Sequence, residues 1–475
     1  MTRIHDLRIH AAGVPGPQSG RDLILYWMQT TQRAHDNFAL EFAIDQANKL
    51  RLPLLVYHGL RQDYPWASDR IHSFILESVV DLYRDFEARG IQYAFYLERD
   101  GDDAETRRHA GNPSPLVALA QRAAVVVTDF FPTFIVPEQI GALRHKVQTP
   151  IVAVDSATVV PMKYHQREFG TAVSFRPKLL AVVPQYLQPL EPGDLKVRRR
   201  INLDFDLTQP GQATIAELVS SCAVDHSVPP ARTIRGGTTA ARARLDRFLK
   251  DGLPRYEDDR ADPNANATSM ISPYLHFGNV SAQEVLLRAR ESGPADQFAK
   301  FQDELLTWRE ISYNFAYHNP RHRTVDAIPA WAREELRRGE SDPRPVLYSD
   351  DEMEQARTGS ELWNAAQRAY VQDGWMHNSV RMLWGKAVLQ WTRNAAESLR
   401  ILEHLNNKYS LDGRDPNTYG GILWIFGKFD RPFYRRPIYG TVRYQSLKAA
   451  EKKFDVGRYV RRYGGISGEL PLAYG

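Results

Sequence analysis

The periodicity of apolar residues changes near residue 238, and this change constrains the fold of the 475-residue chain more than any other feature. Up to about residue 160, runs of β-branched and aromatic residues alternate with amphipathic stretches such as 31–49 and 71–89. The runs cover residues 23–28, 53–60, 91–98, 124–130 and 150–160. Their alternation predicts an α/β domain with a doubly wound parallel sheet that carries helices on both faces. From residue 238 onward only helical periodicity remains, which predicts an all-helical second domain.

These patterns predict three parts along the chain. Residues 1–176 form the α/β domain, residues 177–237 a surface connector rich in Pro, Gly and Ser, and residues 238–475 the helical domain. The α/β domain contains neither a glycine-rich dinucleotide fingerprint nor a phosphate-binding P-loop, so its sequence does not identify a ligand.

Composition narrows the class of protein. The single cysteine, Cys222, excludes an intramolecular disulfide and a thiolate cluster, so we expect a buried inert thiol, no metal site and a reducing compartment. No run approaches the roughly 20 apolar residues of a membrane span, and residues 1–20 lack the apolar core of a secretory signal. We therefore expect a cytoplasmic protein that does not associate with membranes.

The stretch 374–417 concentrates polar residues in a pattern that suits a ligand. If residues 375–392 are helical, one face carries His377, Asn378, Arg381, Met382 and Gly385. The loop beyond it carries Asp412, Gly413, Arg414 and Asp415. A helical arginine and an aspartate on this loop could close over an extended planar ligand. The loop is also typical of a solvated turn, and the pattern alone leaves both interpretations open.

Two further segments combine polar groups with aromatic rings. Thr268, Ser269 and Ser272 precede Pro273, so their hydroxyl and backbone N–H groups suit either a phosphate or an ordinary helix cap. Glu304 and Trp308 share a helical face four residues apart, as a substrate-binding pair or as a surface carboxylate near a core indole. Seven of the nine tryptophans lie after residue 300, a bias that suits a ligand with ring systems.

Basic charge gathers at the end of the chain, although the net charge is only +4. From Gly421 onward, eleven Lys or Arg stand against four Asp or Glu, among eleven aromatic residues. This mixture is typical of a surface that follows a phosphate backbone and stacks bases, but a solvated face would look similar.

Taken in order, the motifs resemble those of the DNA photolyases, which are light-driven, FAD-dependent repair enzymes. The shared motifs are YxxxRxDP from Tyr256, ATSMISPYLHFG, ELLTWRE, LWNAAQ, GWMHN with RMLW, and LDGRDPN with GGILW. The segments YWMQTTQRAHDN, DSATVVP and SFRPK are similar to class II cyclobutane pyrimidine dimer photolyases. The resemblance covers nearly the whole chain. It implies a Rossmann-like antenna domain followed by a helical domain that binds FAD in a U shape.

The resemblance also implies roles for individual residues. Cofactor binding falls to Tyr256, Thr268, Ser269, Met270, Ile271, Ser272, Arg309, Asn378, Arg381, Asp412, Gly413 and Arg414, with Asn406 facing flavin N5. Arg381 and Asp412 form an ion pair beside the flavin ring. Glu304 hydrogen-bonds the flipped dimer, Trp308 and Trp424 pack its bases, and Met382 forms the pocket floor. Trp384 and Trp363 photoreduce the flavin, and Arg260, Arg431 and Arg443 face DNA.

The function implied is cyclobutane dimer splitting in UV-damaged DNA, by electron transfer from excited reduced FAD to a flipped-out dimer. A (6-4) photolyase and a cryptochrome-like flavin photoreceptor are the alternatives; His377 does not separate the two repair activities. The resemblance also suggests a deazaflavin-type antenna chromophore and action as a monomer. Residues 374–378 read GWMHN, where class II relatives usually read GKMHG.

Overall fold

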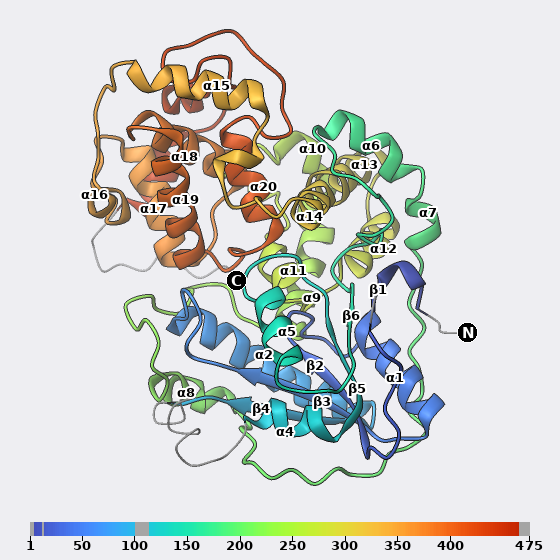
Figure 1. The fold of residues 1–475 in the computed structure, drawn as a ribbon. Helices are drawn as coiled ribbons and strands as arrows, with labels where there is room; N and C mark the ends of the chain where they lie inside the picture. Colours follow the sequence, from blue (N-terminus) through green and yellow to red (C-terminus); the bar gives the residue numbers. More distant parts are fainter. Residues whose placement is uncertain (1–3, 12–13, 100–113, 465–475) are drawn as a thin grey trace.

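The computed structural model describes residues 4–11, 14–99 and 114–464. An N-terminal domain built on a sheet lies below a larger helical domain in the view of Figure 1. Residues 465–475, the end of the predicted basic segment, lie outside the described residues.

The sheet has the order β1-β6-β5-β2-β3-β4. Its strands are β1 (Ile9–His10), β2 (Leu23–Met28), β3 (Leu54–Leu60), β4 (Gln92–Leu97), β5 (Ala123–Asp129) and β6 (Ile151–Val154). All neighbours pair in parallel except β1, which runs antiparallel to β6 at the edge. Chain order reverses at β2, so β2 and β5 form the topological switch point, where α/β sheets hold ligands.

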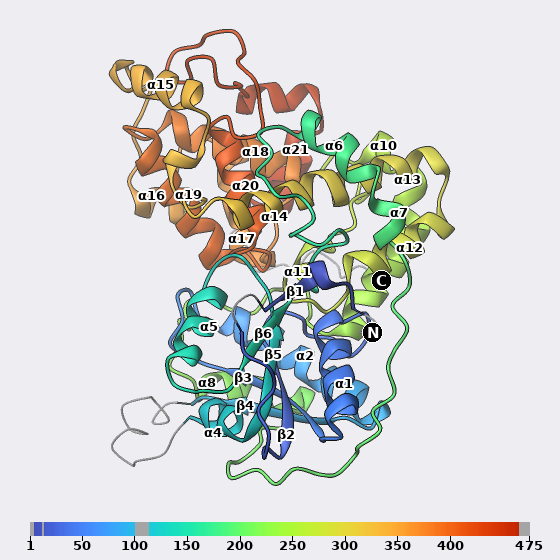
Figure 2. The same cartoon turned by 45° about the vertical axis from the view of Figure 1, so that its right-hand side comes forward.

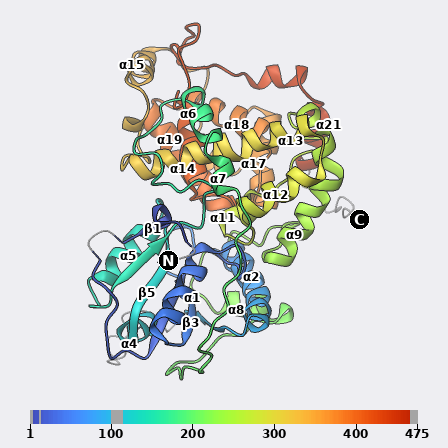
Figure 3. The ribbon, with the colours of Figure 1, turned by 90° about the vertical axis from the view of Figure 1, so that its right-hand side faces the viewer.

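Helices cover both faces of this sheet, as Figure 3 shows from the side. They are α1 (Phe38–Leu50), α2 (Asp69–Ala88), α4 (Pro115–Arg122) and α5 (Val136–Arg144). Alternate residues of β2 explain this arrangement. Ile24 and Tyr26 belong to the same core as α1 and α2, whereas Leu25 and Trp27 pack in a second core with α4 and α5. The prediction of a doubly wound parallel sheet is confirmed.

Three short α-helices lie within or overlap the predicted connector: α6 (Ala172–Leu180), α7 (Val183–Tyr186) and α8 (Ile215–Ser220). A 3-10 helix, η2 (Gln212–Thr214), precedes α8. The chain between α7 and α8 runs down the side of the sheet domain and beneath it (Figure 2). Helix α6 spans the predicted boundary at residue 176 and contacts the helical domain through an ion pair of 2.6 Å between Arg176 and Asp303. The three-part division stays a prediction.

The helical domain contains no strand among the described residues from 238 onward, as predicted. Its α-helices are α9 (Thr238–Arg247), α10 (Tyr256–Asp259), α11 (Ser272–His276), α12 (Ala282–Ser292), α13 (Ala295–Gln302), α14 (Arg309–His318), α15 (Ala330–Arg338), α16 (Asp350–Glu354), α17 (Glu361–Asp373), α18 (Asn378–Gln390), α19 (Ala395–Tyr409), α20 (Pro416–Ile425) and α21 (Val456–Tyr463). A π-helical turn, η5 (Asp303–Trp308), joins α13 to α14.

Three predicted elements have different bounds, and the strand β1 was not predicted at all. The amphipathic stretch 31–49 is helical only from Phe38, because the Asn37 side chain caps α1 there. The predicted helix 375–392 begins only at Asn378, because Gly374 ends α17 in the left-handed conformation (φ +66°) and the His377 side chain caps α18. The predicted strand 150–160 ends at Val154. There the Asp155 carboxylate accepts hydrogen bonds from the N–H groups of residues 157, 158 and 162, which turns the chain.

Buried charged side chains join the two domains. The Arg70 guanidinium, on α2, donates to the carbonyls of Tyr370 at 2.8 Å and of Tyr409 at 2.6 Å. Glu310, on α14, accepts hydrogen bonds from the backbone N–H groups of Val159 and Val160 at 2.6 and 3.3 Å. These contacts fix the helical domain on the sheet domain, since breaking any of them would leave a buried polar group unpaired.

Candidate active site

A cavity of about 530 Å³ lies within the helical domain. Residues from α10, the 268–272 loop, η5, α18 and α20 line it. Of the residues predicted to bind a cofactor or substrate, the lining includes Tyr256, Arg260, Thr268, Ser269, Met270, Ile271, Ser272, Glu304, Trp308, Arg309, Asn378, Arg381, Met382, Asp412 and Trp424. The structure therefore brings together segments separated by up to about 170 positions in the chain.

An ion pair forms one wall. Arg381 donates from one guanidinium nitrogen to both Asp412 carboxylate oxygens at 3.2 Å, and their side chains are 21% and 8% exposed. Burial opposes the charge of Asp412, but Arg381 and hydrogen bonds from Ser272 and Ser410 outweigh it, so the pKa of Asp412 lies below its usual value. The carboxylate is therefore ionised at neutral pH and holds the arginine at the cavity.

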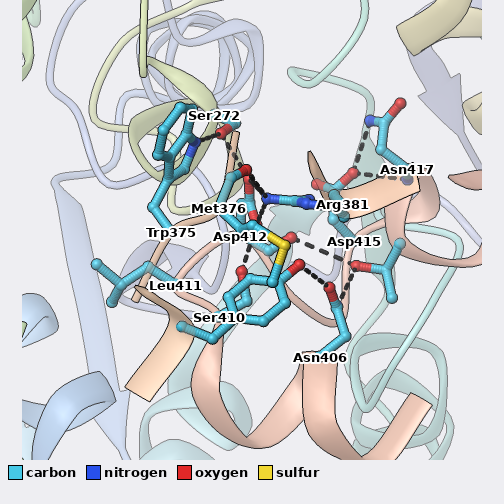
Figure 4. A network of polar contacts seen from close by, with 12 residues as sticks. Ser272, Trp375, Met376, Arg381, Asn406, Ser410, Leu411, Asp412, Asp415 and Asn417 are labelled. Carbon is cyan, nitrogen blue, oxygen red and sulfur yellow. Dashed lines mark hydrogen bonds and ion pairs between the residues drawn. The ribbon is translucent and has the colours of Figure 1, made fainter. Parts of the chain in front are cut away.

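A hydrogen-bond network extends from this pair (Figure 4). The Ser272 hydroxyl donates to Asp412 at 2.5 Å and accepts a hydrogen bond from the Trp375 indole at 3.2 Å. Ser410 donates to the other Asp412 oxygen. The 268–272 loop is thus tied to the aspartate by Ser272, and its Met270 adopts a left-handed backbone conformation with φ +50°.

Two arginines of the cavity lining, Arg309 and Arg381, each carry a guanidinium nitrogen without a hydrogen-bond partner. Among the described residues, Arg309 Nη1 and Arg381 Nε are buried without a partner. The other Arg309 terminal nitrogen donates to the Tyr313 hydroxyl at 3.1 Å. Buried guanidinium N–H groups without partners are costly, so this cavity suits a ligand that carries acceptors such as phosphate or ring carbonyl oxygens.

A carboxylate between two cations lies on another part of the lining. Glu304 is held by Arg260 and Lys300, each at 3.0 Å. The π-helical turn that carries Glu304 also brings Trp308 to the lining, and Trp424 reaches it from α20. A carboxyl group beside two indoles can hydrogen-bond an aromatic base while the indole rings stack on it.

Three residues predicted at the flavin do not line the cavity: Asn406, Gly413 and Arg414. Asn406 is buried and accepts a hydrogen bond from the Tyr370 hydroxyl at 2.9 Å. Arg414 donates to the carbonyls of Asn407, Ser410 and Leu411. Its guanidinium stabilises the backbone of its own loop, so the structure does not bring this charge to the predicted ring site.

The predicted tryptophans Trp384 and Trp363 form a buried chain of rings. Their centroids are 6.0 Å apart at an interplanar angle of 11°, and Tyr370 lies 5.6 Å from Trp384. Arg381, at the cavity, lies 5.4 Å from the Tyr370 ring. Beyond Trp363 the chain continues to Trp391 at 5.5 Å, and then to Tyr348 at 5.1 Å from Trp391.

The predicted DNA-facing arginines differ in their surroundings. Arg260 lines the cavity, while Arg431 is exposed and lies away from the lining. Arg443 is paired with Asp430 at 2.7 Å and lies 5.6 Å from the Trp424 ring. Its side chain is 39% exposed, so it lies between the buried wall and the surface.

Sequence reasoning missed several residues of the site. Trp391 lies seven residues after Trp384, which is two helical turns, so the spacing of the two tryptophans could have identified it. Ser410 and the indole of Trp375 gave no such signal, because a serine at a helix end and a tryptophan beside a glycine are common. Only the contacts of Ser410 with Asp412 and of Trp375 with Ser272 in the folded chain reveal their roles.

A second cavity, of about 490 Å³, lies at the carboxyl ends of β2 and β3. Aromatic and apolar side chains such as Trp27, Tyr57 and Phe134 line it together with Glu98 and Lys146. His276 from the helical domain reaches the same cavity. This position at the topological switch point is the usual ligand site of such a sheet.

Comparison with known proteins decides the family. A family model for DNA photolyase matches residues 24–194, and one for the FAD binding domain of DNA photolyase matches residues 301–469. The chain is 36% identical to a deoxyribodipyrimidine photo-lyase from Methanothermobacter thermautotrophicus, across 98% of this chain and 100% of the relative. The chain belongs to the DNA photolyase family. The predicted family is confirmed, and the helical half carries its FAD-binding domain.

Other similarities agree. A deoxyribodipyrimidine photo-lyase from Arabidopsis thaliana is 33% identical across 92% of this chain and 88% of the relative. A class III photolyase from Agrobacterium tumefaciens shares the fold with a TM-score of 0.66 at 19% identity, across 94% of this chain and 87% of that one. A Synechocystis cryptochrome does so with a TM-score of 0.67 at 17% identity, across 94% and 89%. Both solved structures thus share the fold of nearly the whole chain.

Proposed function

We propose that this photolyase family member is a deoxyribodipyrimidine photo-lyase of class II, which binds FAD and uses light to split cyclobutane pyrimidine dimers in DNA. The observation that carries the proposal is the cavity in which a buried Arg381–Asp412 pair lies with Glu304, Trp308 and Trp424. Relatives that extend over nearly the whole chain carry this enzyme name.

The residues of the cavity fit FAD. The unpaired donors of Arg309 and Arg381 would meet acceptor atoms of the cofactor, and Asp412 would keep Arg381 charged and oriented. Tyr256 and the 268–272 loop offer a phenol, hydroxyls and backbone groups along the same lining. The chemistry that FAD supplies when bound is light-driven one-electron donation.

Glu304, Trp308 and Trp424 would receive the substrate. A cyclobutane dimer stacked in duplex DNA cannot reach an interior cavity, so it would have to be flipped out. The two indoles would pack against its rings, and Glu304, oriented by Arg260 and Lys300, would hydrogen-bond them. To stabilise negative charge on a dimer carbonyl, the Glu304 carboxyl group must donate this hydrogen bond. A donated bond strengthens as that charge develops and so accelerates bond cleavage.

The aromatic chain from Tyr370 through Trp384 and Trp363 to Trp391 would carry electrons inward to the cavity. Successive rings lie 5.1 to 6.0 Å apart, and the chain ends at the half-buried Tyr348. This arrangement supports the predicted role of Trp384 and Trp363, and it adds Tyr370, Trp391 and Tyr348 to the path.

The second cavity supports the predicted antenna chromophore. Its volume of about 490 Å³ and its aromatic walls suit a planar chromophore of deazaflavin type. We also propose that the protein acts as a monomer in the cytoplasm, as the sequence indicates. In the part of the chain that the structure describes, no helix is long and apolar enough to cross a membrane.

Among the residues that the structure describes, no contact specifically supports the (6-4) repair alternative. Burial, reinforced by Arg381, lowers the pKa of His377 to about 4, and its Nδ1 accepts the Ser379 N–H at 3.2 Å as the cap of α18. A neutral capping histidine is poorly suited to donate a proton to a substrate at neutral pH.

One experiment tests the proposal. Purified protein should show flavin absorption, and after reduction and illumination it should restore the 260 nm absorbance of an oligonucleotide with one cyclobutane thymine dimer. A matched oligonucleotide with a (6-4) photoproduct should remain unchanged. Flavin binding without dimer repair would contradict the proposed activity, and repair of the (6-4) photoproduct would favour the alternative.

A further inference from the structure

Lys386 is a buried ammonium group directly behind the substrate-facing wall of the cavity. It lies on α18 with no exposed surface, and its Nζ donates to the Ile425 carbonyl at the end of α20 at 2.6 Å. The same Nζ lies 5.2 Å from the centroid of the Trp424 ring, which lines the active-site cavity. A residue that the proposed mechanism does not use therefore contacts a wall of the substrate site.

A second cation lies close to the same indole ring. The Arg443 guanidinium is 5.6 Å from the Trp424 centroid and makes two hydrogen bonds with Asp430, at 2.7 and 3.2 Å. The Asp430 side chain is only 8% exposed, whereas Arg443 is 39% exposed. Two cations thus lie beside one indole ring, and Asp430 is bonded directly to the more exposed of them.

The charge of Lys386 depends on these neighbours. Burial lowers its pKa to about 7, Asp430 acts to raise it, and Arg443 acts to lower it further. Helices α17, α19 and α20 and the 3-10 helix Leu447–Lys452 pack against α18. Of the described residues, only Asp430 and Arg443 shift this pKa through their charge, and the Tyr439 hydroxyl donates to the Lys386 carbonyl at 2.7 Å.

If Arg443 moved away from Asp430, the pKa of Lys386 would rise. Asp430 would be left as a mostly buried carboxylate without its bonded partner, which is costly unless another cation compensates it. At the same time, the cation that opposes protonation of Lys386 would have moved away. Both changes favour the charged form of Lys386, and the protonated amine can keep its hydrogen bond to Ile425.

We propose that Lys386 is the reserve counter-ion of Asp430, and that binding of dimer-containing DNA, by drawing Arg443 out to the DNA, moves a proton from solvent onto the Lys386 amine. The inference rests on the proposed function, because it requires Arg443 to meet DNA. The proton comes from the buffer and is accepted by the Nζ lone pair, so no other bond is formed or broken in the protein. DNA binding and proton uptake are then linked equilibria.

Calorimetric titration in the dark tests the linkage. The probe is a duplex with one cyclobutane thymine dimer, titrated in phosphate and in Tris, whose different ionisation heats reveal the protons taken up. From a starting pKa of about 7, uptake should approach one proton per duplex at pH 8 and be small at pH 6. Affinity should correspondingly fall by up to about tenfold per pH unit above pH 8.

Variants test whether Lys386 is the residue that takes up the proton. Lys386→Met should bind the dimer duplex without this uptake and without the associated pH dependence, and Asp430→Asn should also lose the uptake. Lys408→Met, which removes from α19 an ammonium group that pairs with Glu354 of α16, should retain the wild-type uptake. Unchanged uptake in Lys386→Met would overturn the inference.

Different results would contradict the role of Lys386 and the proposed photolyase function. Tight, dimer-specific binding with no proton uptake at pH 8 would overturn the role of Lys386 and leave the proposed function intact. Equal proton uptake on an undamaged duplex of the same sequence would also overturn the role of Lys386. In that case the movement of Arg443 would not depend on the dimer. Absence of any preference for the dimer duplex would contradict the proposed function itself.

Discussion

Replacing Asp412 with asparagine should destabilise the protein through the charge that it leaves behind. Arg381 would become a mostly buried cation that keeps its hydrogen bond to the Met376 carbonyl at 3.2 Å and its position 5.4 Å from the Tyr370 ring. At 3.2 Å and an effective dielectric constant of about 20, the lost attraction is about 5 kcal/mol. Asparagine keeps the volume and can still accept from Ser272, so we expect the free energy of unfolding to fall by about 3 kcal/mol.

Urea unfolding of the flavin-free protein measures this change, and a surface pair provides the control. Asp350 binds Arg400 at 2.7 Å, but the two side chains are 52% and 57% exposed, so Asp350→Asn should cost less than about 1 kcal/mol. Adding Arg381→Met to Asp412→Asn should recover most of the stability, because no unpaired cation remains. FAD affinity, measured by flavin fluorescence, should stay at least tenfold weaker in both variants. The reasoning is wrong if Asp412→Asn and Asp350→Asn destabilise equally.

Three further changes test separate parts of the site. Glu304→Ala should keep FAD and DNA binding but lower the yield of repair per single-turnover flash, because the lost hydrogen bond matters most to the electron-bearing dimer; an unchanged yield would refute this role. Trp384→Phe should block photoreduction of oxidised FAD yet spare repair by chemically reduced enzyme, so loss of both would indicate a structural role instead. Arg443→Ala should weaken binding to the dimer duplex and, if the side chain contacts a phosphate, reduce the slope of log affinity against log salt by about one; wild-type affinity at all salt concentrations would show a solvated face.

Local periodicity was enough to predict most of the fold. The run LILYWM coincides with β2, and three other predicted runs match β3, β4 and β5 to within about one residue at each end. Strand β1 could not be found this way, because its two residues carry no pattern and form a strand only by pairing with β6. The start of α18 depended on Gly374 and the His377 cap, which override the apolar periodicity that continues through residues 375–377.

The site was predictable in its residue types but not in its contacts. Spacing and resemblance identified Arg381, Asp412 and Glu304, which line one cavity. They also placed Arg414 at the flavin, although its guanidinium binds the carbonyls of its own loop. An arginine in a DGRDPN loop looks the same in a sequence whether it faces a ligand or the backbone. Only the closed loop, with Arg414 in a left-handed conformation at φ +64°, distinguishes the two.

Residues at the junction of the two domains separate the sheet-domain cavity from the active-site cavity. His276 lines the sheet-domain cavity and lies 3.2 Å from Asp415, which lines the active-site cavity. Asp415 also accepts a hydrogen bond from Tyr313 at 3.1 Å, and burial of its carboxylate is outweighed by His276 and Arg309, so its pKa lies below its usual value. A light-harvesting chromophore and FAD in these cavities would therefore be separated by a packed, charged layer and not by mobile solvent. Buried contacts such as that of Arg70 with Tyr370 hold the two domains in one arrangement. Energy transfer between the two cofactors would depend steeply on their distance and orientation, so these contacts would serve function as well as stability.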